Sequence, residues 1–183
     1  MKKILCFILP LLFVMSSCND YFSDDSEVNE LKSAKKEKYV TIKIHARLSS
    51  TVNYAVPMIS CVPEIAEVAV AGAGWIDGHS SLLGNVNQEE STYIITNCEF
   101  DPSTMTVSAF GTSQMVGANG DMYYLDVVEF IDLTTMNFTG YVDLTGGTGK
   151  FKDATGHVEM INGLVNDDGS GSWEGYGEII LKK

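Results

Sequence analysis

Polar and apolar residues alternate with a period of two along most of the chain, and no window shows the spacing of an amphipathic helix. Residues 39–49, YVTIKIHARLS, place one set of apolar side chains on a single face: Val40, Ile42, Ile44, Ala46 and Leu48. Successive side chains of a strand point to opposite faces, so this alternation predicts a half-buried strand. Comparable stretches occur at residues 68–78, 91–100, 104–110, 122–131, 136–144, 156–164 and 172–181. The chain is therefore expected to form about eight strands.

The order of these segments favours an antiparallel sheet, because none of the regular helical segments that parallel crossovers need stands between them. A sheet of this size removes its exposed edges best by closing on itself. We therefore predict an all-β fold, an eight-stranded antiparallel barrel, with a β-sandwich as the competing architecture. Residues 51–67 contain Pro57 and Pro63 and are expected to be a long excursion between strands, and the part from Glu64 to Val70 could form a short helix.

The N-terminus carries an export signal. Lys2 and Lys3 precede an apolar run of 12 residues, Ile4 to Met15, which is too short for a membrane-spanning helix and is typical of a secretory signal. The following Ser16-Ser17-Cys18 resembles a bacterial lipobox, in which the cysteine is lipidated and becomes the first mature residue. An ordinary cleaved signal with a chance cysteine is the alternative. The expected organisation is a lipoprotein signal peptide at 1–17, a flexible tether at 18–38 and a β-barrel domain at 39–183.

The tether is polar, and its acidic residues begin at Asp20 and cluster from Asp24 to Glu27. Such acids close to a lipidated cysteine resemble the signal that sends some Gram-negative lipoproteins to the cell surface. The expected location is the envelope of a Gram-negative bacterium, as an outer-membrane lipoprotein facing the periplasm or the outside. Acyl chains on Cys18 would then hold the protein to the membrane.

The charge balance excludes one class of partner. The formal net charge is −12, and loss of Lys2 and Lys3 with the signal peptide would leave −14. Nucleic-acid binding depends on neutralising phosphates with basic side chains, so no nucleic-acid partner is expected. The composition does not decide the oligomeric state or the identity of a protein partner.

Two cysteines remain in the predicted barrel domain. Cys61 and Cys98 would be exposed to an oxidising compartment after export and could form a disulfide. The alternative is a buried apolar thiol, because Cys98 alternates with Ile94 and Phe100. The pattern leaves both readings open.

The glycine-rich stretch DLTGGTGKFKDATGHVEM, residues 143–160, is not a phosphate-binding loop. A Walker A loop needs a glycine where Leu144 stands and a serine or threonine where Phe151 stands. In the dinucleotide-binding pattern, Lys152 replaces the third glycine. As β-structure the segment is coherent: Gly146 and Gly147 suit a sharp corner and Phe151 can insert into the barrel end.

The same segment carries a resemblance to a known superfamily. TGGTGKFKDATG, with Gly146, Gly147, Gly149, Phe151 and Gly156, resembles the GGTGxFxxAxG signature of the allene oxide cyclase and dirigent barrels and their bacterial relatives. GHSSLLGNVN, from Gly78, and GANGDMYYL, from Gly117, are similar to two further segments of those bacterial relatives. The resemblance spans residues 72–183 and implies an eight-stranded calycin-like barrel. The matched motifs are structural, so the resemblance implies no catalytic residues here.

No catalytic or metal-binding pattern appears. His45, His79 and His157 are far apart and form no ligand motif, and the NGD of residues 119–121 lacks the spaced ligands of a calcium loop. Neither a metal nor a cofactor is expected. Six aromatic residues could line a cavity or plug the barrel: Trp75, Tyr123, Tyr124, Tyr141, Trp173 and Tyr176.

Three functions fit this sequence. The first is an anchored envelope barrel that binds a small apolar ligand or an envelope partner without catalysis. The second is a small-molecule cyclase or isomerase that acts by confining its substrate in the barrel. The third is a purely structural interaction module, which a fully packed lumen would favour.

Overall fold

The computed structural model describes residues 37–62 and 68–183. The predicted signal peptide, Cys18 and nearly all of the predicted tether lie outside these residues. Within the described ranges, no helix is both long and apolar enough to cross a bilayer.

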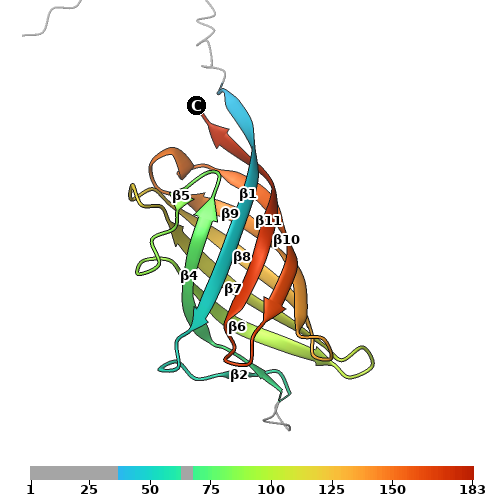
Figure 1. The fold of residues 1–183 in the computed structure, drawn as a ribbon. Coiled ribbons are helices and arrows are strands. Elements are labelled where there is room, and N and C mark those ends of the chain that lie inside the picture. Colours follow the sequence, from blue (N-terminus) through green and yellow to red (C-terminus); the bar gives the residue numbers. More distant parts are fainter. Residues whose placement is uncertain (1–36, 63–67) are drawn as a thin grey trace, which may run out of the picture. The chain divides into compact units, whose positions relative to one another are not determined.

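The described residues form a closed antiparallel barrel (Figure 1). Its eight long strands are β1 (Tyr39–Val52), β4 (Ala73–Ser80), β6 (Thr92–Asp101), β7 (Thr106–Val116), β8 (Met122–Asp132), β9 (Asn137–Gly147), β10 (Thr155–Val165) and β11 (Gly171–Lys182). Three shorter strands and one 3₁₀ turn complete the set: β2 (Ile59–Ser60), β3 (Ala69–Val70), β5 (Gly84–Asn85) and η1 (Gly149–Phe151).

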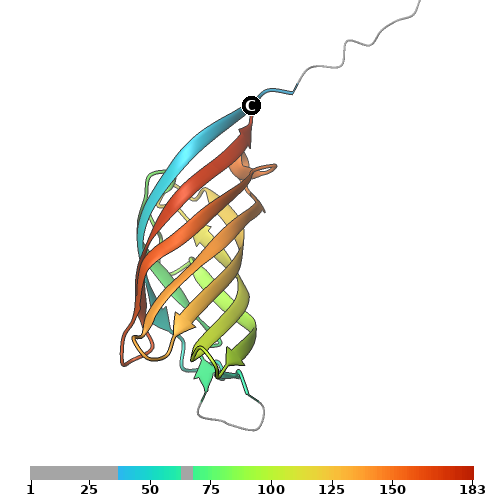
Figure 2. The same cartoon turned by 90° about the vertical axis from the view of Figure 1, so that its right-hand side faces the viewer.

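The first strand closes the ring. β1 pairs with β11 from Tyr39↔Lys182 to Ser50↔Gly171, and with β4 from Ala46↔Ser80 to Val52↔Gly74. The remaining neighbours follow the order β11-β10-β9-β8-β7-β6-β4, and Figure 2 shows β1, β11, β10 and β9 side by side. Because the last strand of this series returns to β1, the predicted barrel is confirmed and the β-sandwich is excluded.

One end of the barrel is plugged. We call it the closed end, formed by the connections at 81–91, 117–121 and 148–154. Phe151 of η1 is fully buried there and meets the Tyr123 ring edge-to-face, with centroids 5.4 Å apart. The amide of Phe151 donates to the Thr148 carbonyl, so the short turn itself aims the ring inward.

The glycines of the signature segment make this plug sterically feasible. Gly146 and Gly149 have positive φ, 132° and 53°, which other residues rarely adopt. A Cβ on Gly147 would lie 2.7 Å from the Phe151 Cβ and 2.2 Å from the Met122 carbonyl oxygen. A Cβ on Gly156 would lie 2.6 Å from an Ile179 methyl, so β10 can begin against β11 only without a side chain at this position.

Among the described residues, the other end has no such plug. We call it the open end, and its described connections are 53–62, 68–72, 102–105, 133–136 and 166–170. The predicted helix in Glu64 to Val70 is wrong where it can be checked, because Ala69 and Val70 form β3 and pair with β2. The rest of that predicted helix lies outside the described residues, apart from Val68, which is not helical.

A β-bulge in β6 contradicts the prediction that Ile94 and Cys98 lie on the same face of the strand. The register shifts between Ile95 and Asn97, so the residues before and after the shift exchange faces. Ile94 is 52% exposed on the outside, whereas Ile95 and Cys98 are buried inside. The predicted alternation of Cys98 with Ile94 is therefore wrong, although Cys98 is buried.

Replacing Phe151 with alanine should strongly destabilise the barrel. Removing the fully buried ring leaves a cavity in the plug. Large-to-small changes of this kind lower the free energy of unfolding by about 3–5 kcal/mol. Phe130→Ala is the control, because Phe130 is 40% exposed and should cost less than about 1 kcal/mol. Urea unfolding of both variants and the parent measures this, and equal losses in the two variants would contradict the role of Phe151 as the plug.

Candidate functional site

The inside of the barrel is a cavity rather than a packed core. Its volume is about 620 Å³, within the usual range for small-molecule sites. The walls are mainly apolar side chains from the inward positions of the strands, among them Ile44, Ile76, Ile95, Leu125, Val127, Ile131, Phe138, Val142, Val158 and Met160. The inward alternation that predicts the strands thus also supplies a hydrophobic lumen.

The cavity extends from the closed end to the open end. Tyr123, packed against Phe151, belongs to its lining, and so do Tyr54, Met58 and Met136 in the open-end connections. These three side chains are 75%, 52% and 38% exposed. Solvent-exposed residues on the rim of a continuous cavity mean that the lumen opens to solvent at this end.

The open end is spanned by a polar contact between two connections. The Tyr54 hydroxyl donates a hydrogen bond of 2.5 Å to the Asp168 carbonyl oxygen, which joins the 53–72 connection to the β10–β11 connection. The Asp168 carboxylate accepts a 2.9 Å bond from the Ser170 amide. Hydrogen bonds from Ser170 lower the pKa of this carboxyl, which keeps it charged at the rim.

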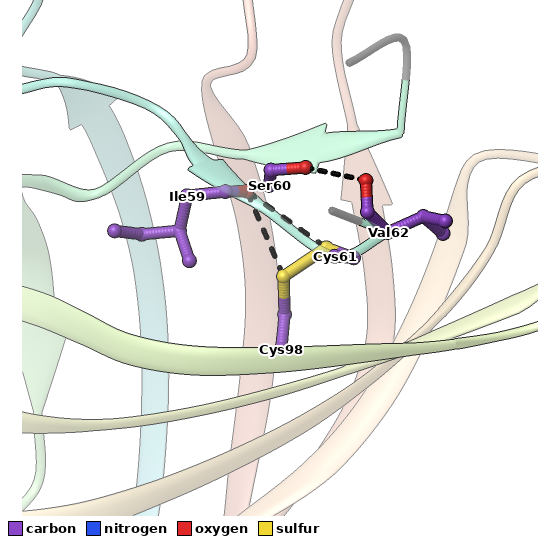
Figure 3. Close-up of a disulfide and its surroundings, with 5 residues drawn as sticks. All are labelled: Ile59, Ser60, Cys61, Val62 and Cys98. Carbon is purple, nitrogen blue, oxygen red and sulfur yellow. Dashed lines mark hydrogen bonds between the residues drawn. A yellow bond between two sulfur atoms is a disulfide. The ribbon is translucent and has the colours of Figure 1, made fainter. Parts of the chain in front are cut away.

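A disulfide fixes the long excursion to the barrel wall (Figure 3). Cys61 follows β2 and is bonded to Cys98 on β6, with a Cα–Cα distance of 4.8 Å. The Ile59 carbonyl oxygen lies 3.6 Å from the Cys98 sulfur, a packing contact because a bonded sulfur has no proton to donate. Closing a loop with a separation of 37 residues removes unfolded-state entropy equivalent to roughly 3–4 kcal/mol.

Glu129 carries a carboxyl group on the inward face of the barrel wall. Glu129 is the fourth of the inward positions on β8, after Tyr123, Leu125 and Val127, and it pairs across the sheet with Ala109 and Gly140. The side chain is half-buried, and the part that is not covered by protein atoms faces the apolar cavity. The carboxyl group is therefore buried inside the barrel and poorly hydrated. This burial raises the pKa of Glu129 to about 7.

Tyr93 on β6 is the polar neighbour of that carboxyl group. Burial raises the pKa of Tyr93 to about 12, with smaller contributions from the charge of Glu129 and from Tyr54. The Tyr93 ring also lies over Gly74, where a Cβ would come within 2.7 Å of its hydroxyl oxygen. Gly74 therefore provides the space that lets Tyr93 lie along the cavity wall.

Most residues singled out from the sequence lie away from this lumen. Of the six aromatic candidates, Tyr123 and Trp173 line the cavity, whereas Tyr124 and Tyr176 are more than 40% exposed. The glycine signature and Phe151 lie at the closed end, and Cys61 and Cys98 lie near the open end. Neither Glu129 nor Tyr93 was identified from sequence, although a lone acid at an inward position of an alternating strand was a usable signal for Glu129.

The three histidines also lie apart. His45 stacks on Tyr176 with centroids 4.5 Å apart, His79 lies 3.2 Å from the Asn85 amide oxygen, and His157 contacts Asp143 at 2.7 Å. In the part of the chain that the structure describes, no three metal-ligating side chains gather. In the NGD segment, Asp121 accepts from Asn119 and pairs with Lys150 at 3.1 Å.

The fold and the cavity together define a closed antiparallel β-barrel with one apolar chamber that opens at one end. No protein-family model matches the sequence, and no curated protein matches it. Among solved structures, the chain is similar to the pterocarpan synthase dirigent protein, with 13% identity over 80% of this chain and 93% of that chain and a TM-score of 0.44. The strand pairing itself shows the barrel fold, and membership in the superfamily indicated by the glycine signature stays a prediction.

The burial of Glu129 predicts an unusual pH dependence of stability. Below pH 4.5 the carboxyl is protonated in both states; between pH 4.5 and about 7 it ionises in the unfolded chain but not in the barrel. Stability should therefore fall as pH rises through this window and level off above it. Glu129→Gln lacks this penalty, so its free energy of unfolding should exceed that of the parent by roughly 1–3 kcal/mol at pH 8. At pH 4 the two free energies of unfolding should be equal.

Urea unfolding across pH 4 to 8 measures the difference. Asp126→Asn is the matched control, because Asp126 is exposed on the outer face of the same strand. A constant difference between Glu129→Gln and the parent at every pH would contradict the raised pKa.

Proposed function

We propose that the protein binds one small, largely apolar molecule inside the barrel and does so without catalysis. The observation that carries this is the open chamber of about 620 Å³ with apolar walls. Eight-stranded barrels are wide enough to hold one small ligand when their inward side chains leave space. Here small residues at inward positions, including Ala46, Ala109 and Gly175, leave that space.

The same observation weighs against a purely structural module. A barrel that served only as a scaffold would gain stability by filling its lumen, since close-packed cores are the rule in proteins. An apolar cavity in contact with water is unfavourable unless a molecule occupies it. The chamber therefore supports ligand binding over a structural role.

A cyclase or isomerase that works by confinement is the second candidate. Glu129 supports it, because a carboxyl group with a pKa near 7 can donate or accept a proton at neutral pH. The closed end of the chamber offers a weaker proton-transfer group, because the Tyr123 hydroxyl already donates to the Met115 sulfur at 3.6 Å. Recovery of a bound molecule unchanged after incubation with the protein separates binding from conversion.

The chamber would act at a membrane surface. We place the protein in the envelope of a Gram-negative bacterium, held to the outer membrane by acyl chains on Cys18. The support is the sequence alone: a basic start, a short apolar run and a cysteine after two serines. Two or three acyl chains are enough for stable anchoring without a spanning helix.

Blocking the chamber should abolish retention of a ligand. Ala109→Phe places a ring inside the lumen, whereas Thr112→Phe adds the same ring at an exposed position of the same strand. Native mass spectrometry of the protein purified from its host should show an added apolar molecule on the parent and on Thr112→Phe but not on Ala109→Phe. An empty parent protein would contradict the proposed function.

Replacing Cys18 with serine should abolish lipidation. The serine variant has no thiol to acylate, so it should incorporate no labelled fatty acid. Cys6→Ser is the control, because Cys6 lies in the predicted signal peptide and should leave the labelling unchanged. Labelling of the Cys18 variant at the parent level would overturn the anchor.

A further inference from the structure

The charges along the chamber all have one sign. Among the described residues that line it, the acidic side chains are Glu129, Asp167 and Asp168, and no lysine, arginine or histidine belongs to the lining. The other polar lining groups are neutral: Ser50, Tyr54, Tyr93, Ser113, Tyr123 and Asn166. An acidic chamber of this kind opposes the entry of a carboxylate or phosphate and attracts a cation.

The Glu129 carboxylate is left without a partner. In the described part of the chain, no hydrogen bond or ion pair involves it. Its cross-strand neighbours are Ala109 on one side and Gly140 on the other, so neither neighbour has a side chain that could reach or cover it. A half-buried carboxylate in apolar surroundings is unfavourable, and a bound donor or cation would relieve that penalty.

Aromatic side chains in the same cavity also favour a bound cation. The aromatic residues Tyr93, Phe138 and Trp173 line the same cavity, and Phe138 and Trp173 pack with centroids 6.0 Å apart. Aromatic faces attract ammonium groups, most strongly where water is excluded. The opposite end, against Tyr123 and Phe151, has no charged lining residue and suits a hydrocarbon.

The open end is also lined by acidic side chains. Asp167 and Asp168 stand on the β10–β11 connection at the rim, and Asp168 is held there by its bonds to Ser170 and Tyr54. A cationic molecule that approaches the rim therefore meets negative charge before it meets Glu129. An anionic amphiphile meets repulsion at both places.

We propose that the chamber selects amphipathic molecules that carry a protonated amine, with the amine at Glu129 and the apolar body toward the closed end. This inference deepens the proposed function and rests on it. It names the class of ligand by charge and excludes fatty acids as preferred occupants.

Three ten-carbon ligands that differ only in the head group test the proposal. Decylamine, decanol and decanoate compete with the uncharged dye N-phenyl-1-naphthylamine for the purified barrel at pH 8, where Glu129 is ionised. Decylamine should displace the dye at a concentration at least tenfold lower than decanoate, with decanol between them. Glu129→Gln should reduce the amine-to-decanoate ratio at least fivefold, and Asp126→Asn should preserve it.

Each failure has a distinct meaning. If the dye itself does not bind, the proposed function falls together with this inference. If the dye binds and decanoate competes as well as decylamine, the chamber binds ligands but the charge selection is wrong. If the ratio in Glu129→Gln equals that of the parent, Glu129 is not the anchor, and the inference is overturned. The parent ratio alone tests the ligand class even if the glutamine variant fails to fold.

Discussion

The two-sided pairing of β1 is the constraint on which the rest of the structure depends. β1 bonds to β11 along one edge and to β4 along the other, so the sheet has no free edge between its first and last long strands. Closure fixes which side of each strand faces the lumen, because a slip of one residue would turn every inward side chain outward. The chamber, the position of Glu129 and the aim of Phe151 all follow from this single register.

The fold was largely accessible from sequence because burial on one face leaves a period of two in every strand. β1 shows this most clearly, with Ile44 and Ala46 buried and Arg47 exposed. The pattern failed where the backbone departs from regular pairing. The bulge after Ile95 adds a residue to β6 without any change of composition, so the exchange of faces between Ile94 and Cys98 leaves no trace in the alternation.

The site was less accessible than the fold, for a physical reason. Sequence patterns report which side chains face inward, but not how much space these side chains leave between them. Phe151 was identified because its glycine neighbours mark a plug, whereas the chamber depends on small residues at inward positions of different strands, such as Ala109 on β7 and Gly175 on β11. Glu129 is the one acid among the inward positions of β8, which the alternation could have revealed, but its small cross-strand neighbours Ala109 and Gly140 are visible only in the structure.

The distance between Glu129 and the plug limits the length of a molecule that can bind with its polar end at Glu129. Tyr123 and Glu129 are six positions apart on β8, about 20 Å along a strand and about 15 Å along the axis of a barrel whose strands are tilted by roughly 40°. A molecule whose polar end rests at Glu129 can bury only that length before it meets the ring of Tyr123. Longer molecules must fold back or leave their polar end at the rim, so the barrel discriminates by length as well as by charge.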